Sequence, residues 1–465
     1  SSAASDVYKR QMMGNGTTSE TDSRFRPTST TNGYEGTFNY IWKIDTLGSQ
    51  FKVLGDYARR EASSHNDNFS HIQPEGLPSV DSTYRDHTDN SFEVAALTLA
   101  LDKKFSPKWS LQTGAKYTRN HTYNNSLYQY LKEEEWVRND DQSLRVDYTE
   151  HIAAAYGVVT AKLGRWGVTA GLRGEYTRTD GRRNGVEQNY FSLFPNANVS
   201  YSLSSDGAYS LVAQYARTIR RPSFWTLMPN RSQISDYTYQ TGNPDLLPSY
   251  TSDVSLTAVL AHKYTLTAGI SIVDDEINQD MVPDAENPDV LGILWLNYDR
   301  TASYYLAASL PFQLAKWWTL NLNANYVYNG MRLSSHGSIR YHHYLFANAQ
   351  TTFTLPGKVY LDLSYRYNNR LYLGSCWVDA MHFLNASIKK SFFGDRLTCT
   401  FSAYNLLNRA QTLGARGDDF VRHQQVRQNW SSIRFQVGVT YNFKAGKAFQ
   451  KKSVEAGAAE DRSRL

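Results

Sequence analysis

Residues 318–329 read WTLNLNANYVYN, and apolar and polar side chains alternate along them. The apolar face consists of Trp318, Leu320, Leu322, Ala324, Tyr326 and Tyr328. The opposite face carries threonine and asparagine and is interrupted only by Val327. Because successive side chains of a β-strand point to opposite faces, this pattern predicts a strand with one apolar and one polar face.

The same alternation occurs elsewhere in the chain, for example along 263–272 and 433–443. No apolar stretch approaches the roughly 20 residues of a membrane-spanning helix. The longest ones, 92–101 and 152–161, have about ten residues, which is the length of a tilted spanning strand. A soluble β-sandwich would alternate as well, so the connections between the strands have to distinguish the two classes of protein.

Short and long connections alternate along the whole chain. Tight turns are predicted at 47–48, 106–107, 164–165, 205–207, 262–263, 315–316, 356–357 and 394–395. Longer polar loops are predicted at 61–87, 120–144, 179–189, 220–248, 274–291, 330–338, 372–378 and 409–429. Outer-membrane barrels have short periplasmic turns and long external loops, whereas a sandwich has no reason to keep its two rims so unequal. We therefore predict an all-β fold, a transmembrane antiparallel β-barrel of the bacterial outer membrane.

The composition and the spacing of aromatic residues support a barrel. The 465 residues are 41% hydrophobic and 14% aromatic, as expected where only every second wall residue faces lipid. Ten tilted strand residues rise roughly 23 Å, close to the ~25 Å height of the apolar band. Aromatic residues that recur about eight to ten positions apart on one strand therefore predict two aromatic girdles, one at each edge of the band. One girdle contains Trp109, Trp166, Tyr209, Tyr264 and Trp317/Trp318, and the other Tyr117, Tyr176, Tyr215 and Tyr326/Tyr328. The net charge of +5 is small and does not suggest a nucleic-acid partner.

We count about seventeen strands, from 33–45 to 430–443. Closed single-chain bacterial barrels have an even number of strands, so we expect 33–443 to be the C-terminal part of a larger barrel. Residues 1–32 are interpreted as a non-native remnant followed by a segment of an external loop. Residues 444–465 are expected to form a disordered periplasmic tail.

The most distinctive stretch is 216–250, which reads ARTIRRPSFWTLMPNRSQISDYTYQTGNPDLLPSY. An arginine–proline pair leads into aromatic residues, and a glycine–asparagine–proline turn leads back into a strand. The residues of this motif are Arg220, Arg221, Pro222, Phe224, Trp225, Gly242, Asn243 and Pro244. Four prolines in this stretch stiffen a long loop that has to leave one strand and re-enter the next.

This motif resembles the barrels of TonB-dependent receptors, in particular the outer membrane protein β-barrel branch of that family. The Asn-Leu-Leu-Asn turn at 405–408 and the terminal Val-Thr-Tyr-Asn-Phe at 439–443 are similar to the same family. The resemblance implies a barrel of 22 strands with an N-terminal plug, which takes up a scarce siderophore, glycan, peptide or vitamin with energy from the inner membrane. Measured against that pattern, we expect the plug, its TonB-contacting segment, a signal peptide and about five strands to be missing at the start of this sequence.

The resemblance also implies the partners. They are outer-membrane lipid, the TonB energising complex acting through the missing plug, and a small-molecule or oligomeric ligand, with a surface lipoprotein as a further candidate. Two other functions remain open: a passive porin or specific channel, and a surface binding protein that uses the barrel as an anchor. A plug sequence upstream would distinguish the first hypothesis from these two.

Candidate ligand-stacking residues are the loop aromatics Trp136, Tyr237, Tyr239 and Trp295, for which loop packing is the alternative that we favour. No catalytic arrangement with a readable spacing occurs, so we do not expect an enzyme, a cofactor or a metal site. The neighbours His342 and His343 should point to opposite faces of a strand. Cys376 and Cys399 are expected at opposite ends of the wall, too far apart for a disulfide.

Overall fold

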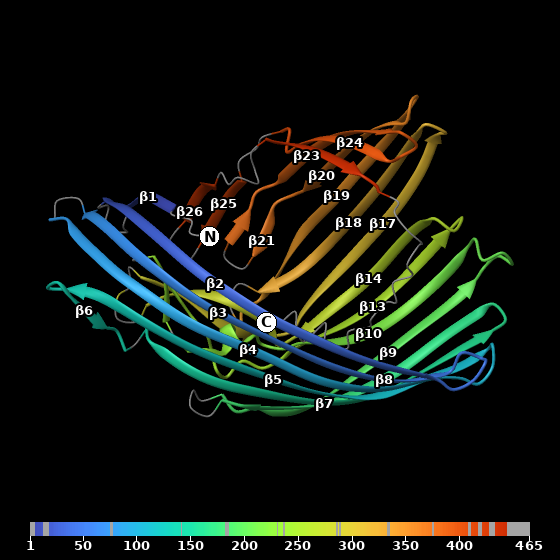
Figure 1. The fold of residues 1–465 in the computed structure, drawn as a ribbon, viewed down its shortest axis with the longest axis horizontal. Coiled ribbons are helices and arrows are strands. Elements are labelled where there is room, and N and C mark those ends of the chain that lie inside the picture. Colours follow the sequence, from blue (N-terminus) through green and yellow to red (C-terminus); the bar gives the residue numbers. More distant parts are fainter. Residues whose placement is uncertain are drawn as a thin grey trace.

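The computed structural model describes residues 5–12, 18–74, 78–140, 142–181, 186–229, 231–235, 238–284, 287, 290–332, 335–373, 376–407, 411–416, 421–426 and 433–443. Its main sheet has 19 strands, of which β1 (Ser5–Met12) and β6 (Glu135–Arg138) are short additions, and the other 17 form a curved wall (Figure 1). The predicted number of wall strands is confirmed.

Each wall strand pairs antiparallel with the next wall strand along the chain. In order they are β2 (Thr18–Lys43), β3 (Gln50–Pro74), β4 (Val80–Lys104), β5 (Trp109–Lys132), β7 (Leu144–Leu163), β8 (Trp166–Asp180), β9 (Asn189–Ser202), β10 (Ser210–Arg220), β13 (Ser249–Leu260), β14 (Tyr264–Asp274), β17 (Thr301–Ala315), β18 (Trp318–Arg332), β19 (Ile339–Leu355), β20 (Val359–Asn368), β23 (Met381–Phe392), β24 (Leu397–Tyr404) and β27 (Arg434–Tyr441). Among the described strands β27 pairs only with β24, so the sheet is open.

The two rims of the wall differ as predicted. All eight predicted tight turns connect neighbouring strands at one rim, on the right in Figure 1. Glycines with positive φ lie in five of them, at Gly48, Gly164, Gly207, Gly357 and Gly394. Only glycine adopts that conformation at no steric cost, so these residues allow the chain to reverse abruptly. The longer connections all lie at the opposite rim.

One side of the wall is taller than predicted. The strands β2 to β5 have 24 to 26 residues, whereas β10, β13 and β14 have 11 or 12. The loops predicted at 61–87 and 120–144 are largely continuations of these strands, since β3 and β4 stay paired as far as Ile72 and Val80. Beyond the membrane both faces of a strand are polar, so the alternation disappears from the sequence while the backbone pairing continues.

The N-terminal boundary also differs from the prediction. The strand β2 begins at Thr18 rather than at Gly33, and β1 pairs with its far end, so part of the segment 1–32 is β-structured. The predicted tail 444–465 lies outside the described residues.

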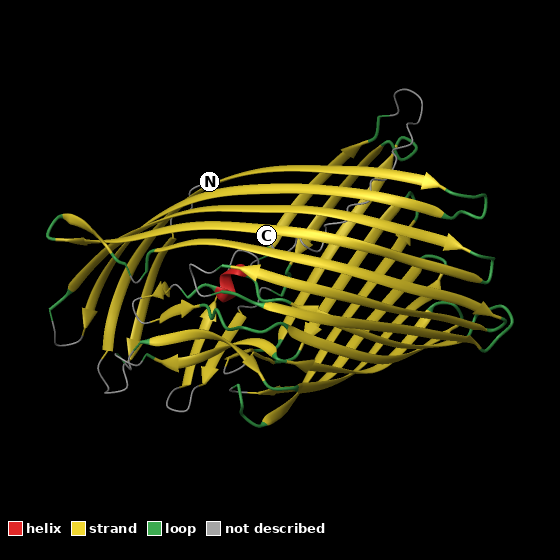
Figure 2. Cartoon of the chain, turned by 90° about the horizontal axis from the view of Figure 1, so that it is seen from below, coloured by secondary structure: helices red, strands yellow, loops and turns green. Residues whose placement is uncertain are grey.

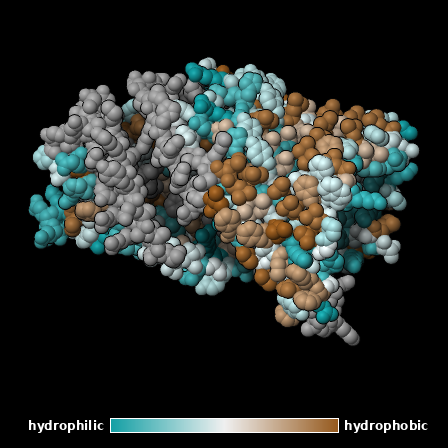
Figure 3. All heavy atoms as spheres, turned by 90° about the horizontal axis from the view of Figure 1, so that it is seen from above, coloured by the Kyte–Doolittle hydropathy of each residue, from teal (hydrophilic) through white to brown (hydrophobic). Residues whose placement is uncertain are grey.

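The register confirms the two faces of the wall. Leu322 lies between Leu310 and Ala349 on its neighbouring strands, while Asn323 lies between Ser309 and Asn348. Many of the large apolar side chains that remain exposed belong to the outward face, for example Leu306 at 57%. Figure 3 shows that apolar residues gather in a band across the surface with hydrophilic residues beyond it. This band is the lipid-facing surface of a membrane barrel.

The long connections, at the rim opposite the tight turns, form two small sheets and a short helix. The first sheet contains β11 (Arg231–Ser235), β12 (Thr238–Thr241), β15 (Glu276–Pro283) and β16 (Leu291–Tyr298), with β12 and β16 parallel. The second contains β21 (Leu371–Leu373), β22 (Cys376–Val378), β25 (Gln411–Arg416) and β26 (Val421–Val426). The helix α1 (Phe224–Leu227) has a single turn, and the described residues include no helix long and apolar enough to cross a membrane.

The predicted separation of the cysteines is confirmed. Cys399 lies in β24, a few residues after the turn at Gly394, and its thiol is free. Cys376 lies in β22, in the small sheet at the opposite rim.

Candidate functional site

A cluster of buried apolar side chains lies inside the wall, near the rim that carries the long connections. The strands β4 and β7 contribute Phe92, Val146 and Tyr148 from their inner faces. The loop between β10 and β13 contributes Leu227, Met228 and Leu246, each at most 2% exposed. Val186 and Ile277 complete the cluster. The loop between β10 and β13 is therefore folded into the interior of the wall, where α1 is visible in Figure 2.

The first half of the sequence motif fixes this loop to the wall. The guanidinium group of Arg221 is paired with the carboxylate of Glu175 on β8 and also donates to the hydroxyl of Thr177 at 3.3 Å. The side chains of Arg221 and Glu175 are 8% and 9% exposed. Glu175 additionally accepts a hydrogen bond from Arg173. Arg220 contacts the Ile277 carbonyl at 3.5 Å, and Pro222 is buried between these anchors.

The second half of the motif packs against the first. The amide of Gly242 donates to the Met228 carbonyl at 2.8 Å, and that of Asn243 donates to the Thr226 carbonyl at 2.7 Å. A Cβ atom at Gly242 would lie 2.3 Å from the same Met228 oxygen, so only glycine permits this approach. Pro244 follows directly and turns the chain toward Leu246. The two ends of the loop are thus held together around α1, and we call this unit, 221–248 with β15 and β16, the loop assembly.

One amide side chain connects the loop assembly to its surroundings, and two more hold its own parts together. Gln188 on the loop before β9 donates from Nε2 to the Leu246 carbonyl at 2.7 Å. Asn297 on β16 accepts from the amide of Leu247 at 2.8 Å and donates to the carbonyls of Leu247 and Asp275 at 2.9 Å. Asn243 donates to the Trp295 carbonyl at 3.1 Å. The sequence gives no signal for Gln188 or Asn297, because each acts on a residue 50 or more positions away.

Two ionisable groups in the β15–β16 hairpin are affected by burial. Burial raises the pKa of Glu276, which accepts a hydrogen bond from the Thr301 hydroxyl at 3.3 Å. Burial also raises the pKa of Tyr298, whose ring is 1% exposed and whose hydroxyl donates to the Gln279 carbonyl. The hairpin therefore carries a carboxyl group whose charged form is disfavoured in the folded loop assembly.

The aromatic residues considered for ligand stacking do not form one platform. Tyr239 and Trp295 lie on the paired strands β12 and β16, and Trp295 packs against the apolar cluster. Trp136 lies on the separate hairpin β5–β6, where the Arg85 guanidinium is 4.2 Å from its ring centre. Tyr237 lies outside the described residues, and for Phe224 and Trp225 only the backbone of α1 is described.

The two adjacent histidines and the first carboxylate of the predicted loop 274–291 have partners of their own. His342 stacks on Tyr372 with ring centres 4.1 Å apart, and His343 lies on the outer face against Tyr326. Asp274 forms an ion pair with Arg300. Within the described ranges there is no group of three or more histidine, cysteine, aspartate or glutamate side chains placed to hold a metal ion.

A family model described as the outer membrane protein beta-barrel family matches residues 42–441. Three solved structures share the fold. The copper transporter OprC is 13% identical with a TM-score of 0.57, and 95% of this chain covers 80% of it. The siderophore receptor PiuA from Acinetobacter baumannii is 10% identical with a TM-score of 0.54 and the same coverage. The ferric yersiniabactin uptake receptor FyuA from Yersinia pestis is 12% identical with a TM-score of 0.57, and 94% of this chain covers 74% of it. No curated protein matches the chain.

Proposed function

This chain belongs to the outer membrane protein β-barrel family, and from that premise we propose that it is the barrel of an outer-membrane receptor that takes up a scarce ligand. Its place is the outer membrane, and its fold is that of transporters and receptors. We assign it no catalytic role.

The loop assembly is the observation that carries this proposal. A passive channel works best with a water-filled bore, whereas here a loop with its own apolar core is fixed to the inner face of the wall. The buried pair of Arg221 and Glu175 and the close contact at Gly242 keep that loop in one conformation. A fixed surface inside the external mouth suits selective capture of a ligand better than free diffusion.

The ligand class follows from the proteins of similar fold. OprC is described as a copper transporter, PiuA as a siderophore receptor and FyuA as a ferric yersiniabactin uptake receptor, so we propose a metal complex first and a vitamin, glycan or peptide next. Energy would come from an inner-membrane complex acting on a plug held within the wall. Tyr239 and Trp295, which share one small sheet, are our candidates for ligand contact on the loop assembly.

Uptake by cells tests the proposal. Cells lacking the intact gene are compared with complemented cells for uptake of radiolabelled copper, a labelled ferric siderophore and labelled cobalamin. We expect one probe to enter only in complemented cells, and its uptake to stop when an uncoupler dissipates the inner-membrane potential. Uptake that continues at the same rate with the uncoupler would identify a passive channel instead. Surface binding without uptake would identify a barrel-anchored binding protein.

A further inference from the structure

Four consecutive upward strands carry the same short sequence, a tyrosine and an arginine separated by one small residue. The four copies are Tyr57-Ala58-Arg59 on β3, Tyr117-Thr118-Arg119 on β5, Tyr176-Thr177-Arg178 on β8 and Tyr215-Ala216-Arg217 on β10. Residues two apart on a strand share a face, so each arginine lies on the same side as its tyrosine. That side is the lipid-facing one, because it also carries exposed Leu97 and Leu172.

The register aligns the copies on β5 and β8 in layers, whereas Tyr57 lies in the row of Arg119 and Tyr215 in the row of Ala170. The row through Tyr117 also contains Leu97 and Tyr176, and the next row toward the external rim contains Arg119, His151 and Arg178 side by side. Directly opposed residues on neighbouring strands have Cβ atoms about 5 Å apart. A tyrosine layer is therefore followed, one row further from the apolar band, by three adjacent nitrogen-bearing side chains on β5, β7 and β8. We call Arg119, His151 and Arg178 the basic row.

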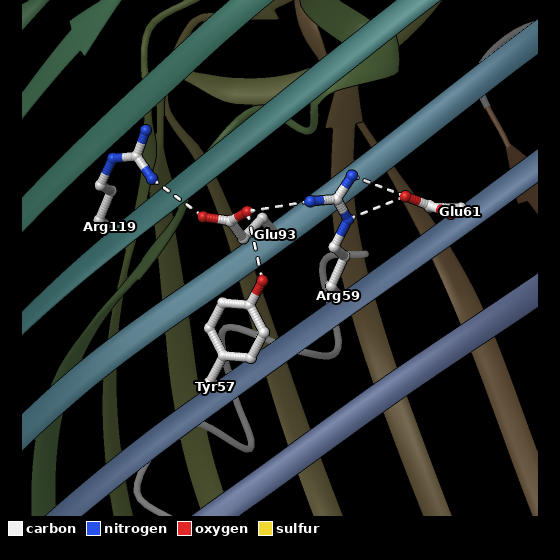
Figure 4. Close-up of polar contacts among 5 residues, drawn as sticks. All are labelled: Tyr57, Arg59, Glu61, Glu93 and Arg119. Carbon is white, nitrogen blue, oxygen red and sulfur yellow. Dashed lines mark hydrogen bonds and ion pairs between the residues drawn. The ribbon is translucent and has the colours of Figure 1, made fainter.

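The acidic groups nearby do not neutralise the whole row. Figure 4 shows Glu93 between two arginines: it accepts from Arg119 at 3.1 Å and lies 3.8 Å from Arg59, which is also paired with Glu61. Arg178 is exposed and forms no ion pair among the described residues. His151 uses Nδ1 to contact the Tyr117 hydroxyl at 2.7 Å.

In the described part of the opposite half of the wall the tyrosine–histidine contact recurs, at Tyr326–His343 and Tyr365–His382, but no arginine takes part. The upward strands β18 and β20 of this half have Tyr326-Val327-Tyr328 and Tyr365-Arg366-Tyr367, with a second tyrosine where the first half has arginine. Arg366 lies on the inner face, since it alternates with outward tyrosines. Strand propensity and girdle formation would affect both halves equally, so they do not account for arginine on one half alone.

We propose that the basic row binds the phosphate of an anionic lipid headgroup in the outer leaflet. Arginine at the edge of the apolar band is placed to donate to phosphate oxygens, and its planar group can do so with two parallel hydrogen bonds. The tyrosine row below holds the acyl chains of the same lipid against the wall. One half of the barrel therefore carries a bound lipid, and the opposite half contacts bulk lipid.

Native mass spectrometry of the full-length protein tests this inference. The protein in a neutral detergent is mixed with phosphatidic acid or with phosphatidylcholine, and the lipids retained are counted. We expect selective retention of phosphatidic acid, weakened about 25-fold by Arg119→Gln/Arg178→Gln, since each basic residue contributes about fivefold. The matched control Arg60→Gln/Arg366→Gln removes two inner-face arginines and should retain the lipid like the unaltered protein.

Three results would overturn the inference. The first is equal retention of both lipids by the unaltered protein, which needs no variant and therefore does not depend on whether a variant folds. The second is unchanged retention by the outward double variant when heat-dependent gel mobility confirms that it is folded. The third is equal competition by inorganic phosphate at the same concentration, which would mean that the row binds free phosphate rather than a lipid.

Discussion

Arg221 and Glu175 lie 46 residues apart in the chain and form an ion pair that is almost completely buried on the inner face of the wall. Removal of one partner of a buried pair typically costs about 3–5 kcal/mol, and because Arg173 still pairs with Glu175 when Arg221 is removed, the loss here should lie at the lower end of that range. We expect Arg221→Ala to destabilise the loop assembly by that amount, measured by hydrogen exchange of 221–248.

The double variant Arg221→Ala/Glu175→Ala should recover much of this loss, because neither charge is then left alone. Arg370→Ala is the control, since its pair with Asp379 is exposed, with side chains 49% and 36% accessible. Exposed pairs contribute about 0–1 kcal/mol, so this variant should change little. An equal loss of stability in Arg221→Ala and Arg370→Ala would contradict the role we give to burial.

Gly242→Ala should disrupt the contact between the two halves of the motif. The added Cβ would lie 2.3 Å from the Met228 carbonyl oxygen, and backbone atoms on both sides leave it no room. Overpacking of this kind costs about 1–3 kcal/mol, and limited proteolysis should then cut within 221–248 sooner. Gly157→Ala is the control, because nothing lies within 4 Å of its Cβ position. Equal protection of both variants would show that the contact at Gly242 is not required.

Leu322→Arg and Asn323→Arg should differ in their effect on folding into bilayers. Leu322 lies in an outward row with Leu310 and Ala349, whereas Asn323 lies among polar residues on the inner face. Arginine on the lipid face near mid-membrane costs about 2–4 kcal/mol, and substitutions facing the lumen are tolerated. Folded fractions after dilution into lipid vesicles measure the difference. The reverse order would mean that the two faces are exchanged.

The β15–β16 hairpin should become less stable as the pH rises above the ordinary Glu276 pKa of 4.5. Burial raises the pKa of Glu276, so the folded hairpin binds a proton more tightly than the unfolded one. Its stability is then highest below the ordinary value and falls as the pH increases through the raised value. Hydrogen exchange of 276–298 between pH 4 and pH 7 measures this slope. The slope should disappear in Glu276→Gln, and a slope that remains would have to come from another group.

The wall was predictable from sequence because the pattern that specifies it is local. Whether Leu322 faces lipid depends on the residues immediately beside it, and the short turns follow from glycine and polar residues within a few positions. The loop assembly depends on distant contacts instead. Gln188 holds Leu246, and Asn297 holds Leu247, over 58 and 50 residues. Nothing near these residues in the sequence indicates their partners.

The height of the wall was missed for a different reason. The alternation of apolar and polar residues marks the part of a strand that contacts lipid, so it ends at the edge of the membrane. The pairing of β3 with β4 continues beyond that edge to Ile72 and Val80. The motif residues were recognised as a group, but the buried position of Arg221 could not be read from them. Its partner Glu175 lies in an ordinary wall strand, one position from an outward tyrosine.

The wall is higher along β2–β5 than along β10–β14. Access to its interior from the external side is therefore easier over the short strands than over the long ones. Molecules that diffuse toward the high side are obstructed by the long strands, whereas those that arrive over the low side reach the loop assembly directly. For the proposed receptor, the rate of ligand capture would then depend on how the protein is oriented relative to its neighbours in a crowded membrane. If two copies packed with their high sides together, both low sides would stay accessible. If they packed with their low sides together, each copy would obstruct access to the other.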